Sequence, residues 1–113
     1  MNATLLSALA EPNRLRIVEL MRDTPCSVGE IARRLTLRQP QVSKHLRMLS
    51  ELGFVAVRAK AQSRIYQLEA RRFEELESWL ETFKNLWESR YQRLDSLLDE
   101  MKADRKTTEG GQR

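Results

Sequence analysis

The residues best suited to chemistry lie in one stretch near the middle of the chain, residues 39–49. Val42, Leu46 and Leu49 recur at helical spacing, which predicts a helix with one buried face. The rest of its surface carries amides, a hydroxyl and cations, the groups that pair with base edges and phosphates in the DNA major groove. A solvated surface helix would show the same pattern, so the neighbouring segments decide between the two interpretations. The candidate DNA contacts here are Gln39, Gln41, Ser43, Lys44 and Arg47.

The segment before this helix predicts a helix-turn-helix. Ser27 and Glu30 have the spacing of a capping box, which starts a short helix. A tight connection joins it to the second helix, which ends at Gly53, a residue suited to a left-handed backbone. Arg38 comes directly before the second helix and is a further candidate phosphate contact. Two short helices joined in this way, the second with a polar outer face, are typical of DNA-binding proteins.

Two short runs of alternating character, residues 54–60 and 64–68, predict a β-hairpin directly after the helix-turn-helix. A hairpin in this place is a wing, and its basic tip can reach phosphates or the adjacent minor groove. The alternative is a solvated hairpin whose charges keep its edge from pairing with other strands. The candidate DNA contacts of the wing are Arg58, Lys60, Gln62, Ser63 and Arg64.

Residues 70–103 contain no Gly or Pro and predict one long helix. Its apolar residues alternate at spacings of three and four, which is a heptad seam of the kind that pairs helices in coiled coils. A helix of this length spans about 50 Å, more than a small domain can cover, so we expect a partner helix from a second copy. Arg90 interrupts the seam and either pairs with an acidic residue of the partner or extends to water. The seam comprises Phe73, Leu76, Leu80, Phe83, Trp87, Leu94, Leu97 and Met101.

Charge separates two portions of the chain. Residues 1–68 hold 11 Lys and Arg against 5 Asp and Glu, a net charge of +6, whereas residues 69–113 hold 9 against 11, a net charge of −2. The basic surplus therefore lies in the part that holds the suspected recognition helix, and it suits a polyanion partner.

The expected fold is mainly α with a small β-hairpin wing, in the order α-α-α-α-β-β-α. Two helices precede the helix-turn-helix, and in the second of them Leu15, Val18 and Met21 are expected to face inward. The expected parts are a winged helix-turn-helix DNA-binding domain over residues 1–69, a C-terminal dimerisation helix over 70–103 and a disordered tail over 104–113.

Together these elements form a winged helix-turn-helix, and the chain resembles the ArsR/SmtB family of bacterial repressors along nearly its whole length. The resemblance implies a homodimer built by the first and last helices, which adds Leu5, Leu6 and Leu9 to the dimer interface. It also implies that two recognition helices enter successive major grooves of a near-palindromic operator on double-stranded DNA, with half-sites about 34 Å apart. The matching segments are ALAEPNRLRI at residues 8–17, QPQVSKHL at 39–46 and LGFV at 52–55, with Arg64 and Tyr66 in the wing.

The chain departs from the family pattern at three places. Arg38 stands where many members have a capping Ser, and the wing tip lacks the usual glycine. Metal-sensing members carry paired Cys on the third helix or His/Asp pairs on the last, whereas here the third helix has no Cys and the last has neither His nor Cys. Asp95 and Asp99 are four residues apart, but two carboxylates alone make a poor site for zinc or a softer metal. We therefore expect no metal and no cofactor.

Two single residues have both a structural and a functional interpretation. Cys26 directly precedes the capping Ser27 and is expected to pack on Ile31 as a hydrophobic staple. The alternative for Cys26 is a redox-active thiol. His45 lies on the flank of its helix's apolar stripe and is expected to be a half-buried structural residue rather than a base reader or ligand.

Four aromatic residues follow one another at a strict spacing of four in the long helix: Trp79, Phe83, Trp87 and Tyr91. Two of them, Phe83 and Trp87, belong to the heptad seam, so the dimer core is the favoured interpretation. The alternative is a pocket for a small apolar effector of unknown identity, which would include Trp79 and Tyr91.

Other classes of function find little support in the sequence. There is no Gly-rich phosphate loop and no His or Cys with an acid-base partner, so an enzyme is not expected. No apolar run is long enough to span a membrane, and a single Cys fits the reducing cytoplasm. The predicted function is a homodimeric, cytoplasmic, sequence-specific DNA-binding transcriptional regulator that represses its own operon and does not sense metal. The alternatives are an effector- or thiol-responsive sensor with the same fold, and a protein-interaction module that has lost DNA binding.

Overall fold

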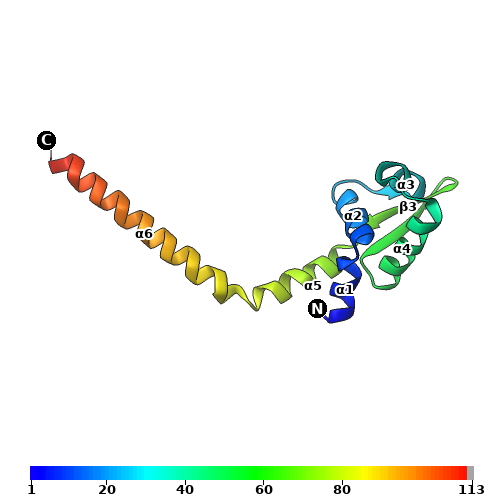
Figure 1. Cartoon of the computed structure of the whole chain (residues 1–113), viewed down its shortest axis with the longest axis horizontal. Coiled ribbons are helices and arrows are strands. Elements are labelled where there is room, and N and C mark those ends of the chain that lie inside the picture. The colour runs from blue at the N-terminus through cyan, green and yellow to red at the C-terminus, as the bar shows by residue number, and fades with distance from the viewer. Residues whose placement is uncertain (112–113) are drawn as a thin grey trace. The chain divides into compact units, whose positions relative to one another are not determined.

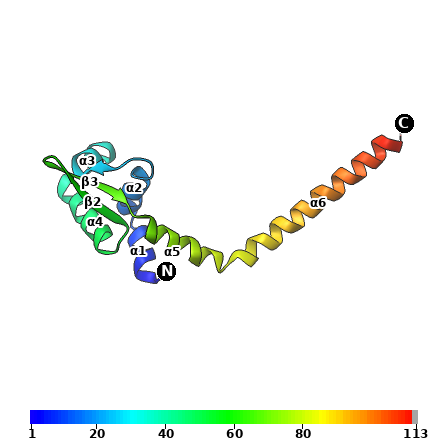
Figure 2. The ribbon, with the colours of Figure 1, turned by 180° about the vertical axis from the view of Figure 1, so that it is seen from behind.

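The computed structural model of the chain describes the backbone of residues 1–111 and the side chains of residues 1–103 (Figure 1). Figure 2 shows the same ribbon from behind. The chain divides into two compact units, Met1–Glu77 and Ser78–Arg113. In chain order the elements are α1 (Ala3–Ala10), α2 (Pro12–Leu20), β1 (Cys26–Ser27), α3 (Val28–Leu35), α4 (Gln39–Glu51), β2 (Val55–Lys60), β3 (Ser63–Leu68), α5 (Ala70–Glu81) and α6 (Lys84–Gly111).

Each of the first three helices begins after a residue whose side chain accepts a hydrogen bond from a backbone N–H in the first turn. These residues are Asn2 for α1, Glu11 for α2 and Ser27 for α3, with donor–acceptor distances of 3.0, 2.8 and 3.2 Å. The Ser27 cap confirms the sequence prediction. Glu is uncommon at this position, so the cap at Glu11 has no strong sequence signal.

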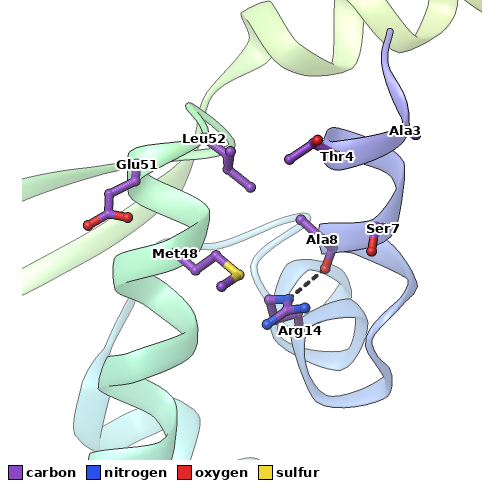
Figure 3. A pocket seen from close by; sticks show the side chains of 8 residues that line it. All are labelled: Ala3, Thr4, Ser7, Ala8, Arg14, Met48, Glu51 and Leu52. Atoms are coloured by element: carbon purple, nitrogen blue, oxygen red, sulfur yellow. Dashed lines mark hydrogen bonds between the residues drawn. The ribbon is translucent and has the colours of Figure 1, made fainter.

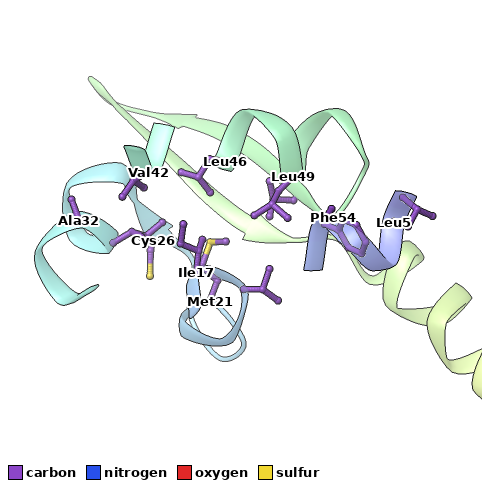
Figure 4. Close-up of a cluster of buried hydrophobic side chains, with 13 residues drawn as sticks. Leu5, Ile17, Met21, Cys26, Ala32, Val42, Leu46, Leu49 and Phe54 are labelled. Carbon is purple, nitrogen blue, oxygen red and sulfur yellow. The ribbon is translucent and has the colours of Figure 1, made fainter. Parts of the chain in front are cut away.

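The core of the first unit is formed by apolar side chains from α1 to β2 (Figure 4). Ile17, Val18 and Met21 are the buried residues at α2 and its end, whereas Leu15 is 41% exposed. The expected inward position of Leu15 is therefore wrong. Leu15 lies about 200° round the helix from Ile17, and Ile17, which is fully buried, sets the inward face.

The wing is a three-stranded antiparallel sheet in the order β1-β3-β2, one strand more than the predicted hairpin. Cys26 of β1 pairs with Tyr66 of β3. A strand of two residues is too short to show an alternating pattern, which is why the sequence gives no sign of it. The turn between β2 and β3 contains Ala61 with a φ of +55°. This is a left-handed conformation, which glycine adopts more readily than any residue with a Cβ.

The predicted single helix over residues 70–103 is wrong, because α5 ends at Glu81 and α6 begins at Lys84. The Thr82 hydroxyl donates to Trp79 O at 2.6 Å, and the Thr82 N–H bonds to the same carbonyl at 3.1 Å. The next backbone bond, Phe83 N to Leu80 O at 3.0 Å, also spans only three residues. A threonine that offers the backbone a local alternative partner interrupts the i to i−4 ladder in this way.

The tail predicted to be disordered, residues 104–113, lies outside the residues whose side chains are described. The backbone of α6 is helical to Gly111. The disorder of this segment stays a prediction.

The corner between α4 and β2 is built around Gly53. Its φ is +83°, and the Phe54 N–H bonds to Leu49 O at 2.9 Å, which is the 6→1 bond of a Schellman motif. The Arg72 Nε of α5 donates to Leu52 O at 2.7 Å at the same corner. Gly53 as the residue after the helix confirms the sequence prediction, and the first turn of α5 is tied to this corner.

We predict that Gly53→Ala lowers the free energy of unfolding by about 1–2 kcal/mol, because an L-residue is strained at this φ. A Cβ at Gly53 would also lie 3.0 Å from the Arg72 Nε. The measurement is the midpoint of urea unfolding followed by circular dichroism. Gly29→Ala is the matched control. Gly29 lies within α3 and the atom nearest to its added Cβ would be Gln39 Nε2 at 3.7 Å, an ordinary contact, so this substitution should leave stability unchanged or raise it. Equal losses in the two variants would contradict this account of the corner.

Candidate nucleic-acid interface

Helix α4 presents its predicted polar residues to solvent. Val42, Leu46 and Leu49 are each 0% exposed, so the buried stripe fixes the rotation of the helix about its axis. The turn that joins α3 to α4 contains Thr36 in a left-handed conformation, with a φ of +56°. The two helices therefore form the expected helix-turn-helix. The exposed candidates on the second helix are Gln39, Gln41, Ser43, Lys44 and Arg47.

The N-terminus of α4 has a cap that the sequence did not indicate. The Arg38 backbone N–H donates to Gln41 Oε1 at 3.3 Å. The Arg38 side chain makes no capping bond, because a guanidinium only donates, and it is exposed to solvent. Gln41 thus has a structural role at its carbonyl end, which leaves its NH₂ group as the part able to contact a ligand.

Arg47 is held along the helix by an acidic neighbour. Its Nε lies 3.3 Å from Glu51 Oε1, with the two side chains 83% and 66% exposed. An exposed pair at this spacing contributes only about 0.2–1 kcal/mol, so Arg47 can exchange Glu51 for another anion at small cost. The spacing of four residues was the available sequence signal for this pair.

The strand register divides the wing cations between two faces. Arg58 lies opposite Ile65, and Lys60 opposite Ser63, whereas Arg64 lies opposite Ala59. Directly opposed residues share a face and successive residues alternate, so Arg58 and Lys60 share one face and Arg64 lies on the other. Gln62 and Ser63, at and beside the tip, are exposed.

A cleft of about 570 Å³ lies beside the wing, and Arg58 and Lys60 contribute to its lining. Glu30 of α3 lines the same cleft. This face of the wing is therefore less uniformly basic than the sequence suggests, because a carboxylate from another element accompanies the two cations.

His45 faces the start of α2. Its Nδ1 lies 3.8 Å from Glu11 Oε2, is buried and has no hydrogen-bond partner among the described residues. The hydrogen bond from the Arg14 N–H holds the pKa of the Glu11 carboxyl below its usual value, and the nearby His45 adds to this effect. His45 is half-buried, as its structural interpretation expects, and it contacts the cap of a neighbouring helix.

Cys26 is fully buried in β1 and belongs to the same core cluster as Ile31. Its Sγ donates to Thr24 O at 3.4 Å. Burial raises the pKa of the Cys26 thiol, and the nearby Glu30 carboxylate adds to the shift. Because the thiolate is the reactive form, these surroundings disfavour a redox role for this residue.

The predicted dimer residues fall into two groups. Leu5 is 6% exposed in its own chain, and Leu9 and Phe73 pack against the same core, so they have limited surface left for a partner. Leu6, Leu76 and Trp87 are partly exposed, and the remaining members of the seam are open to solvent. The exposed members are Leu80, Phe83, Leu94, Leu97 and Met101.

The predicted aromatic series is divided by the break between α5 and α6. Trp79 and Phe83 meet edge to face across the break, with ring centroids 5.2 Å apart. Tyr91, at the other end of the series, is 62% exposed. A continuous helical row of four rings, as the sequence suggested, is therefore not formed.

A hollow of about 580 Å³ lies between α1 and the last turns of α4 (Figure 3). Met48 of α4 and Leu52, which directly follows α4, point toward α1, and the Arg14 Nε donates to Ala8 O at 2.7 Å. Glu51, the partner of Arg47, is the carboxylate among the lining residues. The hollow thus adjoins the C-terminal end of the candidate DNA-contacting helix.

The described residues offer no group of three His, Cys, Asp or Glu side chains that could hold a metal ion. Nor does any helix within this part of the chain have the length and apolar character needed to cross a membrane.

A helix-turn-helix followed by a β-sheet wing, with a polar exposed face on the second helix, defines the class of winged helix-turn-helix proteins. In agreement with this, the family of helix-turn-helix domains matches residues 9–58. The HTH-type transcriptional regulator Rv2034 of Mycobacterium tuberculosis is 42% identical over 62 residues, which cover 55% of this chain and 58% of that protein. The chain thus spans less than two thirds of the length of the curated relatives it matches first.

Solved structures give the same result at the level of the fold. Reduced HlyU from Vibrio cholerae N16961 is 35% identical with a TM-score of 0.59, and the match covers 70% of this chain and 83% of that one. An ArsR family transcriptional regulator, RHA00566, is 28% identical with a TM-score of 0.65, covering 74% and 91% of the two chains. The chain belongs to the ArsR/SmtB family of winged helix-turn-helix transcriptional regulators, which confirms the resemblance seen in the sequence.

We predict that Cys26 reacts with a thiol-specific disulfide reagent at least about tenfold more slowly in the folded protein than in urea, because the folded thiol is buried and its pKa is raised. The chain has one Cys, so the unfolded protein is its own control. The measurement is the rate of thiol modification between pH 7 and 9. Equal rates in the two states would restore the redox interpretation.

Proposed function

We propose that the chain is a homodimeric, sequence-specific DNA-binding transcriptional regulator that represses its own operon. The observation that carries this proposal is the division of α4 into a fully buried apolar stripe and an exposed polar face. That face holds the side-chain types that contact base edges and phosphates in DNA. It belongs to residues 1–68, the part of the chain with a net charge of +6.

The residues of α4 have distinct roles in this proposal. Lys44 and Arg38 contact phosphates and position the helix, whereas Gln39, Ser43 and Arg47 face base edges in the major groove. Gln41 caps the helix with its carbonyl and contacts DNA with its NH₂ group. The wing contributes phosphate contacts through Arg58, Lys60, Gln62, Ser63 and Arg64.

Two copies are required because one recognition helix covers only half of a near-palindromic operator. Half-sites one DNA turn apart, about 34 Å, match a two-fold symmetric pair of winged units. The exposed apolar residues of α6 supply a surface that a second copy can cover. A dimer bound upstream of its own gene would exclude the polymerase and repress transcription.

The test is fluorescence anisotropy of the full chain on its own upstream DNA and on an unrelated duplex, titrated with salt. Tight, salt-sensitive binding with preference for the upstream DNA is expected. Lys44→Ala should weaken binding to both duplexes and reduce the salt slope by about two, one for each copy in the dimer. Arg93→Ala is the charge-matched control on α6 and should leave the slope unchanged.

Salt-insensitive binding, or no binding to either duplex at low salt, would contradict the proposal that the chain is a DNA-binding regulator. That result would favour the protein-interaction module instead. A loss of slope in Arg93→Ala as large as in Lys44→Ala would remove α4 from its proposed role.

We also predict that Glu51→Gln raises DNA affinity about two- to fivefold, because it releases Arg47 from its ion pair. Arg47→Ala should cost about 1–3 kcal/mol at one position of the operator and relax specificity there. Measured by the same anisotropy assay, the gain from Glu51→Gln should vanish in the Arg47→Ala background. A gain that persists in the double variant would mean that Glu51 acts only through general repulsion of DNA.

A further inference from the structure

The hollow between α1 and the end of α4 belongs to the first compact unit and has a largely apolar lining (Figure 3). Its volume of about 580 Å³ lies within the range of about 300–1,000 Å³ that is typical of sites for small ligands. Met48, which points toward α1 across it, is 41% exposed. An apolar molecule can therefore cover a surface that the chain leaves open. The apolar lining residues are Ala3, Ala8, Met48 and Leu52.

Arg14 contributes a positive charge to this hollow and is half-buried. Its Nε donates to Ala8 O at 2.7 Å, so the two terminal NH₂ groups of the guanidinium are the donors that remain. Among the described residues these two groups have no hydrogen-bond acceptor and no carboxylate partner. A charge that is partly withdrawn from water is stabilised by an opposite charge. The guanidinium can therefore offer a carboxylate two parallel hydrogen bonds.

The two carboxylates nearest to this site are engaged elsewhere. Glu51 lines the hollow, but its carboxylate points away from α1 in Figure 3 and its Oε1 lies 3.3 Å from Arg47 Nε. Glu11, at the start of α2, accepts a hydrogen bond from the backbone N–H of Arg14 at 2.8 Å rather than from the guanidinium. The charge of Arg14 is thus the unmatched charge of the hollow, which favours a ligand that carries one negative charge.

The dimer residues expected on α1 lie on the other side of that helix. The hollow is lined by residues 3, 4, 7 and 8, whereas Leu5, Leu6 and Leu9 are the candidates for the dimer interface. At 100° per residue, the centres of these two sets are about 175° apart around the helix axis. A second copy that packs on the leucine side can therefore be present without filling the hollow.

We propose that the hollow between α1 and α4 is a binding site for a small monocarboxylate with an aliphatic body. The carboxylate binds the terminal NH₂ groups of Arg14, and the aliphatic body covers Met48 and Leu52. A ligand bound in this way contacts the C-terminal end of the helix whose exposed face is proposed to contact DNA. The site goes beyond the proposed function, because the ligand needs neither DNA nor a second copy in order to bind.

The test uses octanoate, octan-1-ol and octylamine, which share an eight-carbon chain and differ in the charge of the head group. Each is titrated at pH 7 into the full chain with ¹³C-labelled methyl groups on its four Met residues. Octanoate should bind saturably and shift the Met48 signal, which Met48→Leu identifies, while the signal of Met101 in α6 stays in place. Octan-1-ol should bind at least about tenfold more weakly, because it cannot form the charge-assisted pair, and octylamine should not bind.

Two variants distinguish a carboxylate contact from a merely structural role of Arg14. Arg14→Gln should weaken octanoate binding at least about tenfold and octan-1-ol binding less than about twofold, whereas a collapse of the hollow would weaken both. Arg22→Gln, which replaces an exposed Arg outside the hollow, is the matched control and should change neither affinity. Thr4 is exposed and points toward Leu52, so Thr4→Phe should fill the hollow and abolish binding of both probes.

Four results would overturn the proposal: no saturable binding of octanoate, equal binding of octylamine, a shift of the Met101 signal as large as that of Met48, or unchanged octanoate affinity in Arg14→Gln. None of these titrations contains DNA. A failure here is therefore distinct from a failure of DNA binding by the same protein.

Discussion

The burial of one stripe of α4 is the constraint on which the rest of the structure depends. Val42, Leu46 and Leu49 are fully covered by the core, and this single fact sets which side of the helix meets solvent. Rotating the helix by one residue, about 100°, would bury cations and expose leucines. Because such a rotation would be energetically costly, the polar residues already face solvent in a fixed orientation in the absence of a partner. The Gly53 corner then holds the C-terminal end of the helix, and the Glu11–His45 contact lies at its middle.

Much of the fold was readable from the sequence because it rests on local patterns. The buried stripe of α4, the Ser27 cap and the left-handed Gly53 each correspond to a recognisable sequence pattern within three to eight residues. The failures have local causes as well. β1 is only two residues long. The break at Thr82 depends on a hydrogen bond from its hydroxyl to the carbonyl three residues earlier, a bond that many helical threonines do not make. Leu15 shows that an apolar residue near a helix start does not by itself define the inward face.

The candidate interface was readable only as a set of exposed side chains. The spacing of four residues makes a pair between Arg47 and Glu51 possible, but the rotamers of long side chains decide which contacts form. The pairing of Arg47 with Glu51 and the cap from Gln41 were therefore seen only in the structure. The division of the wing cations between two faces needed the strand register, which a hairpin pattern alone leaves open. Glu30 illustrates the same point, since α3 brings a carboxylate beside cations that lie far along the chain.

The left-handed Ala61 at the wing tip has a consequence for how this protein can change over generations. An alanine at a φ of +55° stores about 1 kcal/mol or more of backbone strain that a glycine would release. An alanine codon becomes a glycine codon through a single nucleotide change, so a relaxed wing is one mutational step away. Lineages can thus adjust the stiffness of the wing tip while every cation and every polar side chain of the wing stays in place.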